Sequence, residues 1–85
     1  MQIVYLASFA RMAKKLGPEV KKQARERTEI FQNDVFDPRL KTHKLHGKMA
    51  GLWAFWINNR DRIVFEFGGK DEIIFHFVGD HSVYE

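Results

Sequence analysis

The chain has 85 residues and no cysteine, which excludes disulfide frameworks and thiolate metal sites within it. Fourteen Lys and Arg against eleven Asp and Glu give a net charge of +3 and a pI near 9.4. We therefore expect an anionic partner, either nucleic acid or an acidic protein segment. The alternative is a basic surface that only keeps the protein soluble. We expect one domain over residues 1–85. Because no apolar run approaches the roughly 20 residues of a membrane span and residues 1–5 do not resemble a signal peptide, we expect a cytoplasmic protein.

The N-terminal part predicts one strand and two helices. Residues 2–7 are rich in strand formers and predict an edge strand, with Ser8 as the N-cap of the following helix. The apolar stripe of that helix is Phe9, Met12, Ala13 and Leu16. Gly17-Pro18 ends it and begins a second helix. The buried residues expected there are Val20, Ala24, Phe31 and Val35. The basic residues of both helices form either a solvated face or a binding patch.

The segment from Phe36 to Gly51 predicts an irregular connection. Phe36-Asp37-Pro38-Arg39 breaks the second helix, because the residue before a proline is driven out of the helical region. The next twelve residues contain two histidines and three lysines. We expect Leu40 and Leu45 to tuck under the sheet and anchor this loop.

Residues 51–84 predict a three-stranded antiparallel meander, because aromatic and β-branched runs are separated by the polar breaks 58–61 and 68–71. Alternation predicts one apolar face made of Trp53, Phe55, Ile57, Ile63, Phe65, Phe67, Ile73, Phe75 and Phe77. The opposite face is expected to carry Ala54, Trp56, Asn58, Arg62, Val64, Glu66, Ile74, His76 and Val78. The fold class is therefore α+β: a small antiparallel sheet, formed by the N-terminal strand and the C-terminal meander, with two N-terminal helices packed on one face.

The register places Arg62 beside the exit of the last strand. If Phe67 and Ile73 pair across the second turn, Arg62 lies opposite Val78; a slip of one pair places it opposite His76. In both registers Arg62 lies close to the segment that holds a histidine and a tyrosine, His81 and Tyr84.

His43 can reach the same cluster only if its segment returns alongside the sheet. Nine peptide steps separate His43 from Leu52, enough to span about 30 Å when extended, against about 20 Å for a six-residue strand.

Two kinds of chemistry are candidates for these residues. A metal site would use His43 and His46 with His76, His81 or Asp80, but no HExxH pattern or cysteine pair supports it. Metal-free RNA cleavage fits better, because attack of a ribose 2′-hydroxyl on the adjacent phosphate needs a base, an acid and a cation.

His43, Arg62 and His81 supply these three functions. Tyr84 is a fourth polar group, and Trp56 is a candidate platform for stacking a base. Each residue also has an ordinary structural alternative. Arg62 would then pair with Asp80, Trp56 would fill a gap, and His43 would only solvate a loop.

The ordered motifs resemble a known family. Two short helices are followed by His-Lys-Leu-x-Gly, Gly-Leu-Trp-Ala-Phe-Trp-Ile, Arg-Asp-Arg-Ile-Val-Phe and Gly-Asp-His-Ser-Val-Tyr. Over nearly the whole chain this order resembles the RelE/ParE superfamily of bacterial toxins, nearest its YoeB and YafQ branches. The resemblance implies an antiparallel sheet with helices on one face and a ribosome-dependent mRNA endonuclease. It also implies a cognate antitoxin from the same operon, in a heterotetramer or larger complex.

By position, the resemblance implies that Arg62 contacts the scissile phosphate and that His43 is the base. It implies that His81 is the acid or charge stabiliser and that Tyr84 lies near the terminal aromatic. The strand lysines of RelE are absent, since Ala54 and Trp56 stand about where they would be, so the histidine-based mechanism fits better.

The remaining functional expectations concern RNA contacts and competing classes. The residues expected to contact mRNA or ribosomal RNA are Lys41, Lys44, His46, Lys48, Trp56 and Arg60. No cofactor and no metal is expected. The competing classes are a ParE-like toxin that inhibits DNA gyrase without nuclease activity and a basic RNA-binding module.

Overall fold

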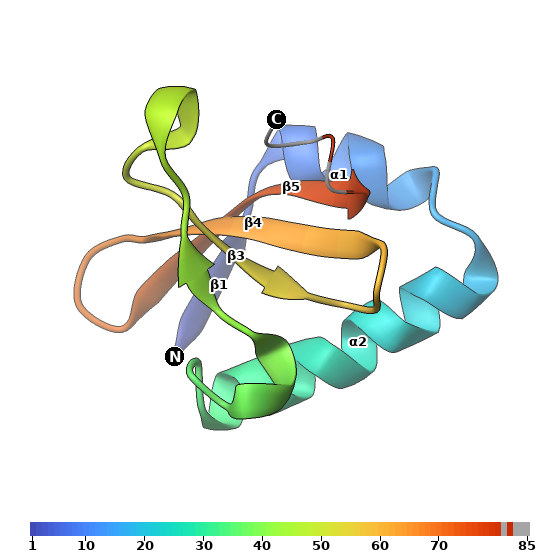
Figure 1. The fold of residues 1–85 in the computed structure, drawn as a ribbon, viewed down its shortest axis with the longest axis horizontal. Coiled ribbons are helices and arrows are strands. Elements are labelled where there is room, and N and C mark those ends of the chain that lie inside the picture. Colours follow the sequence, from blue (N-terminus) through green and yellow to red (C-terminus); the bar gives the residue numbers. More distant parts are fainter. Residues whose placement is uncertain (81, 83–85) are drawn as a thin grey trace.

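A five-stranded sheet forms the centre of the computed structural model, which describes residues 1–80 and residue 82 (Figure 1). The strands lie in the order β1–β5–β4–β3–β2. Their bounds are β1 Gln2–Tyr5, β2 His43–Lys44, β3 Trp53–Trp56, β4 Asp61–Phe67 and β5 Glu72–Asp80. β1 pairs with β5 in parallel and all other neighbours are antiparallel, so the sheet is mixed. The α+β class and the C-terminal meander are confirmed.

The N-terminal elements agree with the sequence analysis except at the first helix cap. β1 is an edge strand, as expected. Helix α1 spans Ala7–Lys14 with Leu6 at its N-cap and no side-chain cap, so the assignment of Ser8 as the cap is wrong. The backbone N–H of Leu6 still bonds the carbonyl of Phe75, at 3.1 Å, and the helix begins directly afterwards. Ser8 therefore falls in the first turn, where its hydroxyl donates to the carbonyl of His76 at 2.7 Å.

The main core lies between the sheet and the two helices. Helix α2 spans Pro18–Asn33 and, as expected, begins at Gly17-Pro18. Its Phe31 is fully buried and packs on Phe55 at 4.7 Å between ring centroids, with Phe65 at 4.9 Å and Phe75 at 5.8 Å. The stripes expected on both helices pack against this core: Phe9, Met12, Ala13, Leu16, Val20, Ala24 and Val35.

A β-bulge in β5 changes the predicted faces near the site. Phe65 pairs with Phe75, but the preceding Val64 pairs with Phe77, so β5 contains one extra residue, His76, between them. Phe77 therefore leaves the apolar core face to which the alternation assigned it and packs near Val64, while Val78 enters the main core. The expected pair of Phe67 with Ile73 is confirmed, yet Arg62 lies opposite Gly79 rather than Val78.

The segment after α2 contains structure that the sequence pattern did not indicate. A 3-10 turn, η1 (Pro38–Leu40), is followed by β2 and by a second 3-10 turn, η2 (Gly47–Met49). Leu40 and Leu45 are both buried, as expected, but in different clusters: Leu40 joins the main core, and Leu45 joins a smaller cluster with Ala54 and Val64 on the opposite face.

Asp37 holds the start of η1. Its carboxylate accepts from the backbone N–H of Arg39 at 2.9 Å and from the Arg39 guanidinium, and these bonds lower its pKa to about 2. Neither helix, within residues 1–80, is long and apolar enough to span a bilayer.

Replacing Phe31 by alanine tests the central packing. Because its ring joins α2 to three strands with no exposed surface, we expect Phe31→Ala to lower the free energy of unfolding by about 3–5 kcal/mol. Phe36→Ala is the matched control, since Phe36 is 57% exposed, and should change it by less than about 1 kcal/mol. Urea unfolding followed by circular dichroism measures both; equal losses would contradict the assignment of the core.

Candidate active site

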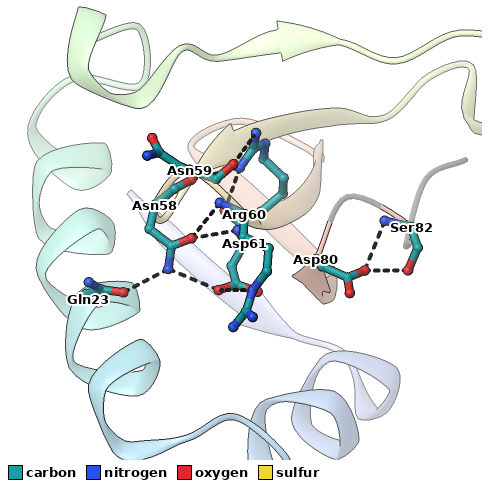
Figure 2. Close-up of polar contacts among 8 residues, drawn as sticks. Gln23, Asn58, Asn59, Arg60, Asp61, Asp80 and Ser82 are labelled. Carbon is teal, nitrogen blue, oxygen red and sulfur yellow. Dashed lines mark hydrogen bonds and ion pairs between the residues drawn. The ribbon is translucent and has the colours of Figure 1, made fainter.

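A tight turn between β3 and β4 builds one end of the candidate site (Figure 2). The side-chain carbonyl of Asn58 accepts from the backbone N–H groups of Arg60 and Asp61, at 2.8 and 2.7 Å. Asparagine favours such positions because its short side chain can bond to backbone two residues ahead. Its amide nitrogen donates to Gln23 of α2 at 2.8 Å and to the Asp61 carboxylate at 3.0 Å. The turn is thereby fixed both internally and to the helix layer.

The guanidinium of Arg62 is bound to the backbone of this turn. Its Nη1 donates to the carbonyl oxygens of Asn58 and Asp61, at 2.8 and 3.1 Å, and its Nη2 donates to that of Asn59 at 3.2 Å. Arg62 is only 6% exposed. Its Nε–H is buried and has no hydrogen-bond partner among the described residues.

No carboxylate neutralises Arg62 within residues 1–80 and 82. Asp61 is the nearest in sequence, but its Oδ2 interacts with Asn58 and, at 3.6 Å, with Nε of Arg60. Asp80 accepts hydrogen bonds from the backbone N–H and the hydroxyl of Ser82. A buried cation is costly without a counter-charge, so this arrangement attracts an anion.

The indole of Trp56 is in contact with two cations. The guanidinium carbon of Arg62 is 3.8 Å from the ring centroid, and Nζ of Lys41 is 4.7 Å from it. Trp56 pairs with Arg62 across the two strands, which places both on the face opposite the helices. The ring that the sequence assigned to base stacking is thus already in contact with two cations.

His43 lies on the same face as Arg62, because β2 pairs His43 with Ala54 and Ala54 pairs with Val64. The return of this segment along the sheet, required by the sequence argument, is confirmed. Two strand spacings and two residues along the strand separate the Cα atoms of His43 and Arg62, a distance of about 12 Å.

The ring of His43 has a defined tautomer when neutral. Its Nδ1 lies 2.8 Å from the carbonyl oxygen of Lys41. A carbonyl can only accept, so Nδ1 carries the proton and the lone pair lies on Nε2.

The other predicted contact residues are only partly brought together. Lys44 pairs with Trp53 and stacks over its ring at 5.5 Å, on the helix side of the sheet and away from His43. His46 and Lys48 are exposed around η2, and Arg60 is exposed in the turn. His81 and Tyr84 lie outside the described residues.

Within the described part of the chain, the metal alternative is not supported by a set of ligands. The described residues contain no group of three or more His, Asp or Glu side chains that could hold an ion. His76, one of the proposed ligands, interacts through Nε2 with the Glu66 carboxylate at 2.9 Å.

Sequence reasoning did not assign a role to Asn58, Asn59 or Gln23. The Asn-Asn-Arg-Asp break signalled a turn, and asparagine at its start is a known signal for side-chain-to-backbone bonding. The link from Asn58 to Gln23 joins residues 35 positions apart and has no local signal.

Solved structures share this fold over nearly the whole chain. A YoeB/ParE toxin from Agrobacterium tumefaciens has a TM-score of 0.79 at 19% identity, covering 95% of this chain and 99% of that one. YafQ from E. coli strain BL21(DE3) has a TM-score of 0.80 at 15% identity, covering 96% and 94%. YoeB in its Staphylococcus aureus complex with YefM has 0.76 at 16% identity, covering 95% and 97%. The RelE/ParE-type fold expected from the motifs is thereby confirmed.

No family model and no curated protein sequence matches the chain. At identities below 20% the likeness to solved structures establishes the fold alone.

Arg62→Met separates a functional from a structural role for the buried guanidinium. Because no carboxylate in the described part of the chain offsets the buried charge, an apolar side chain of similar length should leave the free energy of unfolding within about 1 kcal/mol of wild type, or raise it. Arg62→Ala is the control and should destabilise more, because it leaves a cavity beside Trp56. Thermal and urea unfolding measure both. A loss above about 3 kcal/mol in Arg62→Met would mean that the arginine serves the fold.

Proposed function

We propose that this chain is the toxin of a type II toxin–antitoxin system and that it cleaves mRNA on the ribosome. The observation that carries the proposal is the buried Arg62, with an unpaired Nε–H and no carboxylate among the described residues, on the same sheet face as His43. Support for the toxin class comes from the fold shared with YoeB and YafQ, whose solved structures include complexes with the antitoxins YefM and DinJ.

The proposed reaction transfers the phosphate within the RNA strand. Nε2 of His43 removes the proton of the ribose 2′-hydroxyl, and the 2′-oxygen forms a bond to phosphorus. Arg62 offsets the negative charge that builds on the phosphate oxygens. The bond from phosphorus to the 5′-oxygen then breaks, and His81 donates the proton that this oxygen needs, with Tyr84 as a further polar group. The products are a 2′,3′-cyclic phosphate and a 5′-hydroxyl.

Access to Arg62 requires a local movement. Only 6% of its surface is exposed, so a phosphate reaches the guanidinium when a neighbouring side chain shifts. Lys41 is the mobile candidate, because its flexible, exposed side chain lies over the Trp56 ring, which Arg62 also contacts. Lys41, together with exposed His46, Lys48 and Arg60, supplies further contacts to mRNA or ribosomal RNA; Lys44 is proposed for the same role from the other face of the sheet edge.

An antitoxin segment is proposed to dock in the groove between α1, α2 and the sheet. The groove has a volume of about 580 Å³ and an apolar floor that includes Phe9, Ala13 and Leu16. Lys14, Lys21 and Arg25 line its rim, with Glu29 as the one acidic member. An amphipathic acidic helix matches both the floor and this charge.

Induced expression with a mapped transcriptome tests the enzymatic proposal. We expect wild type to arrest growth and to produce cuts confined to translated messages, with 2′,3′-cyclic phosphate ends. His43→Ala and Arg62→Met should each slow single-turnover cleavage of ribosome-bound message by roughly two to four powers of ten. Lys70→Ala, in the distant β4–β5 turn, is the control and should cleave normally.

Three outcomes would overturn parts of this proposal. Cleavage of naked RNA at the same rate would remove the ribosome dependence. DNA damage without RNA cuts would point to gyrase inhibition of the ParE kind. RNA binding without cleavage would reduce the chain to a binding module.

Charge reversal in the groove tests the antitoxin surface. We expect Lys21→Glu with Arg25→Glu to weaken binding of the protein encoded by the adjacent gene by at least about tenfold, because both cations line the groove. Lys70→Glu changes one charge far from the groove and serves as the control. Isothermal titration calorimetry measures the affinities, and unchanged binding by the double variant would place the antitoxin elsewhere.

A further inference from the structure

We propose that Asn58 is a positioning residue for Arg62: it shapes the turn that holds the guanidinium so that the edge formed by Nε and Nη2 remains for a phosphate oxygen pair. This inference rests on the proposed function for the identity of the phosphate, which is the scissile group of an RNA strand. The role of Asn58 in orienting the guanidinium does not depend on whether the chain cleaves RNA.

The side chain of Asn58 sets the local geometry of the turn. Oδ1 of Asn58 accepts from two successive N–H groups, those of Arg60 and Asp61, and so draws the chain back on itself (Figure 2). The backbone N–H of Ile57 closes the same turn by donating to the carbonyl of Asp61 at 2.9 Å. The carbonyl oxygens of residues 58, 59 and 61 are then all within reach of the Arg62 guanidinium.

The Arg62 guanidinium keeps an unpaired donor. A guanidinium has five N–H groups in a fixed fork. The three carbonyl bonds come from Nη1 and Nη2, and Nε has no partner among the described residues. Arg39 uses its Nε and Nη2, at 3.0 and 2.8 Å, to hold both carboxylate oxygens of Asp37. The edge of Arg62 that contains the unpaired Nε–H is therefore the one that Arg39 uses for a bidentate anion contact.

The neighbouring carboxylate of Asp61 is held away from Arg62 by other contacts. Asp61 is 4% exposed and adjacent to Arg62, so it is the obvious competitor for the guanidinium. Nδ2 of Asn58 donates to its Oδ2 at 3.0 Å, and Nε of Arg60 lies 3.6 Å from the same oxygen. Asn58 thus performs two tasks: its oxygen forms the turn, and its nitrogen occupies the carboxylate.

Together these contacts orient a cation without neutralising it. Carbonyl oxygens are dipoles with no net charge, so Arg62 keeps its full positive charge for the incoming phosphate. Because the dipoles are already oriented, little reorganisation is needed when charge builds in the transition state. Trp56 limits tilting of the guanidinium plane by stacking on it at 3.8 Å.

The direct test observes the Arg62 Nε–H signal by nitrogen-15 NMR during titration with inorganic phosphate. The signal is assigned by its loss in Arg62→Met. In wild type we expect a saturable shift of this signal. In Asn58→Ala we expect the apparent dissociation constant for phosphate to rise by at least about tenfold. Lys70→Ala, in the distant β4–β5 turn, is the control and should bind phosphate like wild type.

Asn58→Asp is a second variant that tests the same role of Asn58 if Asn58→Ala does not fold. Aspartate retains the oxygen that accepts from Arg60 and Asp61, so the turn is preserved. It loses the nitrogen that occupies Asp61 and adds a carboxylate beside Arg62. We expect the variant to fold but to melt at a lower temperature than wild type, because its new carboxylate lies at hydrogen-bond distance from that of Asp61. We also expect it to bind phosphate more weakly than wild type. Wild-type phosphate affinity in Asn58→Asp would overturn the role assigned to the side-chain nitrogen.

A double-mutant cycle on cleavage supplies the second readout. If Asn58 acts through Arg62, Asn58→Ala should slow cleavage by about a hundredfold alone and cause no further loss in the Arg62→Met background. Additive effects would overturn the inference and make Asn58 a general stability residue. If phosphate shifts the Arg62 Nε–H signal of the wild-type protein but that protein cuts no RNA, the inference about Asn58 stands and the nuclease proposal is wrong. A wild-type Nε–H that phosphate does not shift would overturn the inference whatever the cleavage result.

Discussion

The ring of Phe31 joins α2 to the three central strands, and the arrangement of the molecule follows from that contact. It meets Phe55 of β3, Phe65 of β4 and Phe75 of β5 with no surface left exposed. The helices cover one sheet face in this way. The opposite face carries the smaller apolar cluster around Leu45 and the polar residues of the candidate site. Docking of α2 also brings Gln23 to the β3–β4 turn, so the core packing and the candidate site are mechanically connected.

The buried Arg62 guanidinium lowers stability but keeps a positive charge available for binding an anion. Among the described residues no carboxylate pairs with the Arg62 guanidinium, so taking it out of water disfavours folding. Three carbonyl bonds together with the Trp56 ring offset that cost only in part. A pairing with Asp61 would have been more stabilising but would have removed the charge from use. Such a trade of stability for an available charge is expected where a residue serves binding or catalysis.

The bulge in β5 is the point where local irregularity determines what faces the site. One extra residue, His76, shifts the remainder of the strand so that Gly79 lies opposite Arg62. In the uninterrupted register Val78 would have stood there, with a branched side chain beside the guanidinium. The bulge instead sends Val78 into the main core. Bulges next to functional sites commonly redirect side chains in this manner.

The sequence by itself determined the two helices, the edge strand, the meander and most of the apolar face, because these depend on residue spacing and on turn residues such as Gly17-Pro18 and Asn58-Asn59. Its motifs also predict that His43 and Arg62 belong to one functional set. Only the tertiary structure decided that β2 exists, that Phe77 and Val78 exchange faces, and that Arg62 is buried against its own turn. The two-residue β2 has no periodicity of its own and forms because β3 offers it hydrogen-bond partners. The environment of Arg62 likewise depends on bonds and packing between distant segments, such as Gln23 with Asn58, whose energy has no counterpart in the local pattern.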